Sequence, residues 1–286
     1  MFEIPQIEII TEDLRKGFYR IENTAYHSSA GVSSTTVKKA LNSYGNFVSP
    51  REAKDCFNFG SAFHCFVLEP ALFSSLYVVA PVIPGHKNSN AYKAQYEAFV
   101  QQSHGKEIIG AEDYQTIVNM ANILYGHPDF STAGFQPEIM AVTRCKETGL
   151  LIKCKADQFS GFINDLKTTS ASVIPHEFMN EVIKYGYHVS MAFYQDIVAD
   201  IIGVAPTMKI TAVEKRAPHD CAVFTLGDSL LEEGRKLYKA GLRRIKKWND
   251  LGPADSLRAD YRKYTLEANS RMRYNAEDIL KFTGDV

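Results

Sequence analysis

The stretch from Leu150 to Thr168, LLIKCKADQFSGFINDLKT, decides the fold of this 286-residue chain. Residues 150–159 and 162–168 have the apolar content of two strands. Ser160-Gly161 separates them and is a two-residue turn suited to a β-hairpin. The turn at 146–149 (KETG) precedes them, and residues 138–143 (EIMAVT) supply one more strand. The sequence therefore predicts a β-meander in the middle of the chain.

Charged residues of this hairpin converge on one patch. Asp165 and Lys167 are two positions apart on one strand, so their side chains point to the same face of the sheet. The hairpin brings Asp157 beside them. Two carboxylates with an ammonium suit metal-assisted phosphodiester hydrolysis, since Mg²⁺ prefers carboxylate oxygens and activates a bound water. A lone D-x-K is also common as a surface ion pair, but the apolar neighbours here favour a functional cluster.

Two residues outside the hairpin are further candidates for the same site. His64 lies in NFGSAFHCFVLEP, residues 58–70, an apolar run ending at a proline that predicts a buried helix. A lone histidine there is either a core residue or a metal ligand. Glu138 begins the preceding strand, where it is either a solvated strand end or an additional carboxylate.

The order of the remaining elements predicts an α/β fold with a mixed central β-sheet flanked by helices. We expect an edge strand at 7–10 and two later strands at 208–215 and 221–226. Ser33-Ser34-Thr35 can cap an expected helix at about 36–42. The other expected helices cover about 91–103, 111–126, 171–182, 187–202 and 228–249, with a loop at 80–92. The chain reads as one domain, 1–286, with a core of about 26–226 followed by a basic helix and polar tail at about 228–286.

Composition sets limits on the class of protein. There are 32 basic and 33 acidic side chains, so any nucleic-acid surface must be local. No apolar run is long enough for a membrane helix, and the start lacks a secretory signal, so we expect a cytoplasmic protein. Five cysteines without CxxC spacing argue against a disulfide framework, a structural zinc site and an iron–sulfur cluster.

The motifs taken together resemble the RecE (exodeoxyribonuclease VIII) exonucleases of the PD-(D/E)XK superfamily. Their order is G-x-x-x-H, then E, then D-x7-D-x-K, then a helix with a tyrosine. The segments that carry the resemblance are YHSSAGVSST, GSAFHCFVLEP, KETGLLIKCKADQF, DLKTTSAS, YGYHVSMAFYQD and AVEKRAPHDCAVF, from about Tyr26 to Phe224. Ala156 replaces the proline of the PD element, which the chemistry does not require.

The resemblance implies a restriction-endonuclease-like core and a set of site residues. The divalent ion, Mg²⁺ with Mn²⁺ as a substitute, would be bound by His64, Asp157, Asp165 and the backbone carbonyl of Leu166. Lys167 would serve the attacking water, and Glu138 would add a catalytic carboxylate.

The resemblance also implies DNA contacts. Related enzymes place a Q-x-x-x-Y helix near the DNA, whereas this chain has Ser190 in the position of the glutamine. The candidate DNA-binding residues are therefore Tyr187, Tyr194 and Gln195, together with Arg243 and Arg244 of the basic helix. That helix carries seven basic residues, and it is either a solvated face or a phosphate-contacting surface.

The expected activity is exonucleolytic digestion of one strand of linear duplex DNA from its 5′ end, which leaves a 3′ overhang for recombination in a phage or prophage setting. The expected partners are duplex DNA ends, a single-strand annealing protein, and further copies of the chain in a tetrameric ring. The alternatives are a structure-specific endonuclease with the same core and a non-catalytic DNA-binding module.

Overall fold

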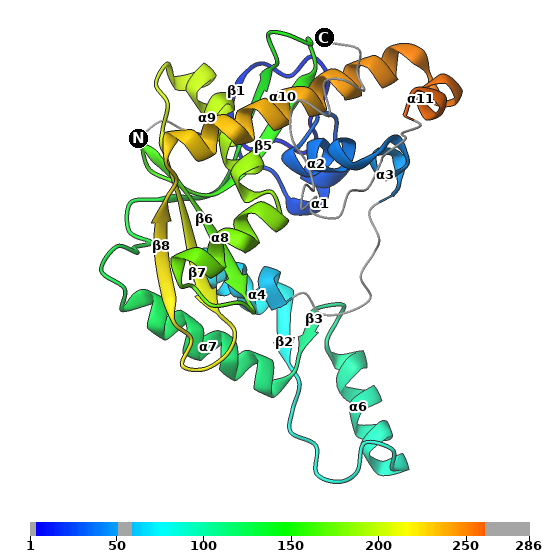
Figure 1. Cartoon of the computed structure of the whole chain (residues 1–286). Coiled ribbons are helices and arrows are strands. Elements are labelled where there is room, and N and C mark those ends of the chain that lie inside the picture. Colours follow the sequence, from blue (N-terminus) through cyan, green and yellow to red (C-terminus); the bar gives the residue numbers. More distant parts are fainter. Residues whose placement is uncertain (1–3, 51–58, 261–286) are drawn as a thin grey trace, which may run out of the picture.

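The computed structural model describes residues 4–50 and 59–260 (Figure 1). Three sequence predictions fall outside this part of the chain: Cys56, the start of the predicted helix at Asn58, and the polar tail from residue 261. Among the described residues, no helix combines the length and apolar character needed to cross a bilayer. The four described cysteines are free, as expected for thiols without CxxC spacing.

The chain alternates between helices and strands. The helices are α1 (Asn23–Ser28), α2 (Ser34–Asn42), α3 (Tyr44–Val48), α4 (Phe59–Leu68), α5 (Pro70–Leu76), α6 (Asn90–Gln102), α7 (Ala111–Tyr125), α8 (Pro175–Lys184), α9 (Tyr187–Ile202), α10 (Asp228–Leu251) and α11 (Pro253–Ala259). The strands are β1 (Gly17–Tyr19), β2 (Tyr77–Val79), β3 (Glu107–Ile109), β4 (Gln136–Arg144), β5 (Leu151–Phe159), β6 (Phe162–Thr169), β7 (Thr207–Glu214) and β8 (Cys221–Thr225).

A six-stranded sheet forms the centre of the molecule, with the order β1-β4-β5-β6-β7-β8. β6 and β7 are parallel, and every other neighbouring pair is antiparallel, so the sheet is mixed as predicted. The predicted hairpin joins β5 to β6, and its turn residue Gly161 has φ +74°, which a residue with a side chain rarely adopts. β2 and β3 form a separate two-stranded parallel ribbon.

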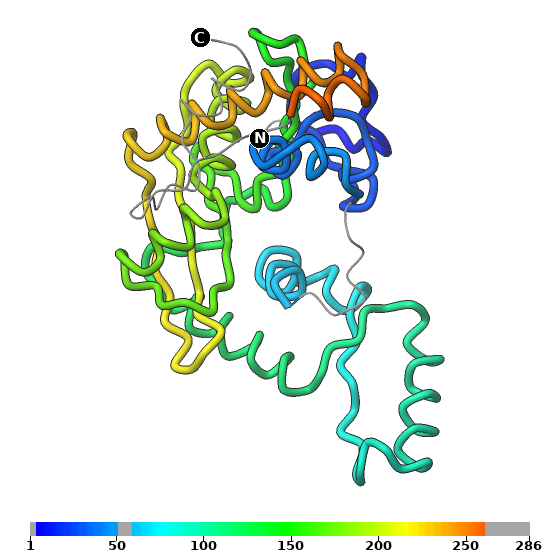
Figure 2. The backbone as a smooth tube through the Cα atoms, turned by 45° about the vertical axis from the view of Figure 1, so that its right-hand side comes forward, coloured from blue at the N-terminus to red at the C-terminus, as the bar shows by residue number. Residues whose placement is uncertain are grey.

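Helices cover both faces of the large sheet. One cluster of buried residues packs α2, α8, α9 and α10 against it, and a second cluster packs α4 and α7 against Leu166 and Val213 of the other face. α9 and α10 approach so closely that a Cβ on Gly234 would lie 2.3 Å from the carbonyl oxygen of His188. By contrast, α6 and the loop before it extend away from the sheet in both views (Figures 1 and 2), and α6 buries none of its residues.

Most predicted boundaries agree with the structure to within a few residues, and two differ for clear reasons. The edge strand predicted at 7–10 is wrong: Gln6 makes only an isolated bridge to Arg20, and the edge strand is β1. The helix predicted from 171 begins at Pro175 instead, because proline fits the first turn of a helix and disfavours helical backbone before it.

The basic helix α10 does not present its charges as an open cationic surface. Five of its seven basic residues form side-chain ion pairs, namely Arg235 with Asp196 and Glu232, Lys236 with Glu233, Arg243 with Glu147, Arg244 with Asp260, and Lys246 with Asp250. The prediction that Arg244 faces DNA is wrong. Arg244 is only 3% exposed and donates to the Leu41 carbonyl. Its guanidinium lies 4.7 Å from the Trp248 ring centroid. Successive residues on a helix point about 100° apart, so Arg243 remains at the surface while Arg244 enters the core.

We expect Arg244→Met to destabilise the fold far more than Arg243→Met. The first substitution removes the cation that pairs with the Asp260 carboxylate, which still accepts from the Tyr44 amide, and the donor to the Leu41 carbonyl. Breaking such a largely buried ion pair typically costs about 3–5 kcal/mol. The second breaks a partly exposed ion pair with Glu147, worth about 0–1 kcal/mol. Urea unfolding of the two variants measures the difference. Equal midpoints would contradict the buried role of Arg244.

Candidate metal centre

The site forms where the large sheet opens between β5 and β6. Within the described residues, the ladder between these two strands consists of two pairs next to the turn. These pairs are Gln158 with Asn164 and Phe159 with Ile163. Beyond them, the Asp157 carboxylate accepts a hydrogen bond from the Leu166 backbone amide at 2.7 Å, in place of a main-chain partner. The hairpin therefore brings Asp157 to β6 as predicted, and the site lies at the end of a short ladder.

Three potential ligands for one metal ion meet at this opening. His64 of α4, Glu138 of β4 and Asp157 of β5 each offer one ligand atom, and these atoms all lie within 4.8 Å of one another. His64 Nδ1 is 3.5 Å from Asp157 Oδ2. The His64 side chain keeps 23% of its surface exposed, so it is a pocket residue and not a core histidine. The structure thus brings together two residues expected to bind metal and the acid expected to be catalytic.

Glu138 is held by its backbone and by a neighbouring lysine. Its φ is +53°, an uncommon value for a residue with a side chain, and such strain is concentrated at functional sites. Lys155 Nζ lies 2.8 Å from Glu138 Oε2 and also donates to Asn23 Oδ1 at 3.0 Å. Sequence reasoning missed Lys155, although its position two residues before Asp157 on the same strand places both side chains on one face.

Asp165 and Lys167 form the other half of the cluster. Lys167 Nζ is 2.5 Å from Asp165 Oδ2, and it donates to the Leu166 carbonyl at 3.2 Å. Burial alone would lower the pKa of Lys167, but the carboxylates of Asp165 and Asp157 outweigh it and raise the pKa above its usual value. Lys167 is therefore a cation in the metal-free protein. The metal-ligand roles of Asp165 and of the Leu166 carbonyl stay predictions.

Burial shifts the pKa values of His64 and Asp157 in opposite directions. It lowers the pKa of His64 to about 4, assisted by the Lys167 charge, so the imidazole is neutral near pH 7 and able to coordinate. It raises the pKa of Asp157 well above its usual value, and the Asp165 carboxylate raises it further. Carboxylate oxygens with one imidazole nitrogen are donors that a divalent cation accepts, so the residues present fit a metal ion.

We expect Mn²⁺ binding to the metal-free protein to release protons. Coordination requires the carboxylate form of Asp157, whose pKa is raised, whereas His64 is already neutral. Metal affinity should therefore increase as the pH rises through the pKa of Asp157. Calorimetric titration in buffers with different ionisation enthalpies counts the protons released. A binding enthalpy that is the same in every buffer would contradict this expectation.

The tyrosines of α9 face the site, and the predicted glutamine does not. The Tyr194 side chain lines the pocket. The Tyr187 ring centroid is 5.6 Å from Lys167 Nζ. The prediction that Gln195 contacts DNA is wrong. Gln195 is buried, donates to the Pro206 carbonyl and accepts from Arg235. It therefore cannot replace the missing DNA-contacting glutamine, because one step along the helix turns it away from the face that carries Tyr194.

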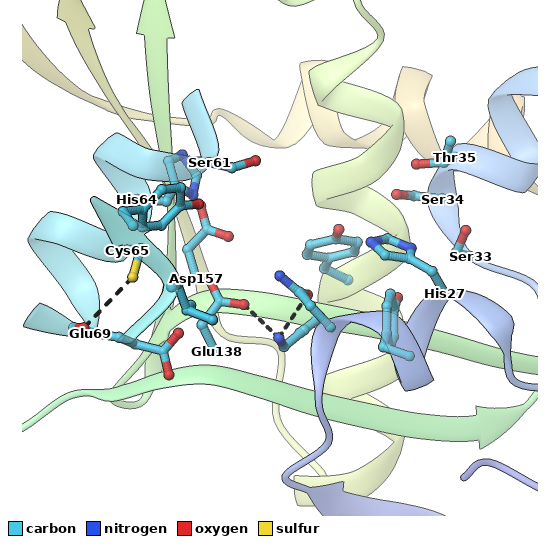
Figure 3. A pocket seen from close by; sticks show the side chains of 16 residues that line it. His27, Ser33, Ser34, Thr35, Ser61, His64, Cys65, Glu69, Glu138 and Asp157 are labelled. Carbon is cyan, nitrogen blue, oxygen red and sulfur yellow. Dashed lines mark hydrogen bonds and ion pairs between the residues drawn. The ribbon is translucent and has the colours of Figure 1, made fainter. Parts of the chain in front are cut away.

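A second wall faces the three potential ligands across a pocket of about 250 Å³. Figure 3 shows His27 and the hydroxyl side chains of Ser33, Ser34 and Thr35 on one side, with His64 and Asp157 on the other. The hydroxyls belong to the start of α2, where Ser33 accepts a hydrogen bond from the Thr36 amide as the predicted helix cap. Sequence reasoning predicted the cap but not its place in the site.

Comparison with known proteins supports this fold. The model of the PDDEXK-like domain of unknown function (DUF3799) matches residues 31–263. The crystal structure of a "Putative exonuclease" from Eubacterium rectale is similar with a TM-score of 0.56 and 17% identity, over 87% of this chain and 96% of that one. No curated protein sequence matches the chain. The predicted restriction-endonuclease-like α/β core is confirmed, and the chain belongs to the DUF3799 family of PDDEXK-like domains.

Proposed function

We propose that this protein is a divalent-metal-dependent nuclease that cleaves DNA phosphodiester bonds. One observation carries the proposal: His64, Glu138 and Asp157 come together from three separate elements within 4.8 Å. The Asp165–Lys167 pair lies beside them on β6. A buried group of acids and a cation without such a role would be a costly arrangement. The PDDEXK-like family and the exonuclease-like neighbour point to the same class of reaction.

The protein residues have separable tasks in this reaction. His64, Glu138 and Asp157 would hold Mg²⁺, or Mn²⁺ in its place, and Asp165 with the Leu166 carbonyl would complete the set. When bound, the ion would polarise the phosphate and lower the pKa of a water molecule. Lys167, which is protonated, would orient that water and offset the negative charge that develops on the phosphate. Tyr187 and Tyr194 would contact the DNA strand from α9.

We further propose exonucleolytic digestion of linear duplex DNA from the 5′ end, which leaves 3′ overhangs for recombination. The resemblance of the sequence motifs to RecE supports this finer assignment, and so does the description of the neighbour from Eubacterium rectale as an exonuclease. A structure-specific endonuclease built on the same core is the alternative. The complete set of site residues argues against a non-catalytic DNA-binding module.

Digestion of matched DNA substrates tests the proposal. Linear duplexes labelled at the 5′ or the 3′ end, and the same sequence as a closed circle, are incubated with Mg²⁺ and with EDTA. We expect Mg²⁺-dependent loss of the linear duplex, early release of the 5′ label, and an intact circle. Cleavage of the circle would favour the endonuclease. Inactivity on every substrate with Mg²⁺ and with Mn²⁺ would overturn the nuclease assignment.

A homo-oligomeric ring, a tetramer by the RecE resemblance, is proposed as the working form, with a single-strand annealing protein as its partner. A ring would let an almost neutral chain stay on DNA, because it repeats each subunit's contacts around the duplex. The ion pairs along α10 argue that the inner surface lies elsewhere on the chain. Light scattering gives the oligomeric state, and a stable monomer that digests processively would refute the ring.

A further inference from the structure

Lys153 is a buried lysine with an unusual set of contacts. Its residue is 3% exposed, and its ammonium donates to the carbonyl oxygens of Tyr26 at 2.6 Å and Ser29 at 2.8 Å. It also lies 4.7 Å from the Tyr26 ring centroid. Within the described part of the chain, no carboxylate forms an ion pair with it. Its partners are instead the carbonyls at the C-terminal end of α1, where the helix dipole is negative.

These contacts attach one pocket wall to the strand that carries the metal ligand. Lys153, Lys155 and Asp157 alternate along β5, so their side chains share one face. Lys155 reaches Asn23 at the start of α1, and Lys153 reaches the end of the same helix. The position of one pocket wall therefore depends on β5. The lining residues concerned are Asn23, Tyr26, His27 and Ser33.

Backbone contacts continue the attachment beyond α1. Val32 forms an isolated parallel bridge with Ile152, donating to the Leu151 carbonyl and accepting from the Lys153 amide. Gly31 has φ +96°, and a Cβ there would lie 3.3 Å from the Lys153 Cδ, so the segment passes directly over the lysine stem. The residues immediately after this segment begin α2 and supply the hydroxyl groups of the wall.

The charge on Lys153 is a poor way to stabilise a fold. A buried cation without a carboxylate partner keeps most of its desolvation penalty. Burial lowers the pKa of Lys153 to about 8, which is the same penalty expressed as proton affinity. The ammonium instead fixes the positions of two carbonyls and a ring at the edge of the pocket.

We propose that Lys153 is a positioning residue, which holds the wall formed by α1 and the start of α2 at the distance from the metal ligands that a DNA strand requires. This inference rests on the proposed nuclease function, which identifies the occupant of the pocket as a DNA strand. The placement of the wall does not depend on that function, because it follows from the contacts of Lys153, Lys155 and Val32. Lys153 itself lies outside the pocket lining.

The test compares Lys153→Met, which keeps the length of the side chain without its charge, with Lys153→Arg, which keeps charge and donors. Lys209→Met is the matched control, because Lys209 also contacts a ring, that of Phe162, but lies outside the pocket lining. Amide hydrogen exchange of residues 26–35 reports on the wall, and Mn²⁺ calorimetry reports on the ligands. Fluorescence anisotropy with a duplex end in Ca²⁺ and the KM for cleavage in Mg²⁺ report on the binding of the DNA strand.

For Lys153→Met we expect faster exchange confined to residues 26–35, unchanged Mn²⁺ affinity, and about tenfold weaker DNA affinity with a matching rise in KM. Lys153→Arg should recover most of the DNA affinity, and Lys209→Met should match the unmodified protein. Unchanged exchange, or loss of the whole fold in Lys153→Met, would overturn the positioning role. An unmodified protein that binds and cleaves no DNA would refute the proposed function and leave the exchange result as the test of the wall.

Discussion

Replacing Asp157 with asparagine should reduce cleavage by at least about a thousandfold, since the several kcal/mol that a Lewis acid supplies would be lost. The amide oxygen of the new side chain would still accept from the Leu166 amide, so the local backbone should remain in place. The substitution removes a carboxyl group that burial disfavours as an anion. We therefore expect the metal-free variant to melt at the same temperature as the unmodified protein or above it, while Mn²⁺ binding is lost.

Glu147→Gln is the control for this experiment, because Glu147 is a partly exposed acid that pairs with Arg243 and lies outside the pocket lining. It should leave both cleavage and Mn²⁺ affinity unchanged. An Asp157→Asn protein that still cleaves within tenfold of the normal rate would remove Asp157 from the site. A variant that loses activity together with its fold would show that the carboxyl group has a structural role instead.

The elements that the sequence predicted best are those with strong local signals. The Ser160-Gly161 turn fixed the hairpin between β5 and β6, and the apolar run after Gly186 predicted α9 at its observed limits, Tyr187–Ile202. The spacing of Asp165 and Lys167 predicted their contact, because side chains two apart on a strand share a face. In each case the information lies within a few neighbouring residues.

The parts that could not be predicted depend on long-range packing. Ser33 reads as a helix cap, but only the Val32–Ile152 bridge shows that the cap lies in the same pocket as His64 and Asp157. Lys153 looks like a solvent-facing position in an alternating strand, yet α1 buries it. Arg244 belongs to a run of basic residues that charge alone assigned to one surface, whereas Asp260 and Trp248 hold it in the core.

Lys167→Met should separate metal binding from cleavage, which Asp157→Asn cannot do. Lys167 is a buried cation whose pKa the carboxylates of Asp165 and Asp157 raise, so its removal takes one positive charge from beside the ligands. Coulomb repulsion toward a divalent ion then falls, and Asp165 loses its 2.5 Å partner. Mn²⁺ should therefore bind the variant at least as tightly as it binds the unmodified protein.

Cleavage by the same variant should nevertheless fall by about a hundredfold to a thousandfold, the range typical of losing one donor that stabilises charge in the transition state. The loss should appear in kcat, with DNA affinity in Ca²⁺ retained, because the ammonium would act on the water and not on the bound strand. Calorimetry and single-turnover cleavage on one protein preparation provide both values, with Lys209→Met as the control. Normal cleavage by Lys167→Met would refute the assigned role, and Mn²⁺ affinity that falls with the rate would show that the lysine supports the ligands instead.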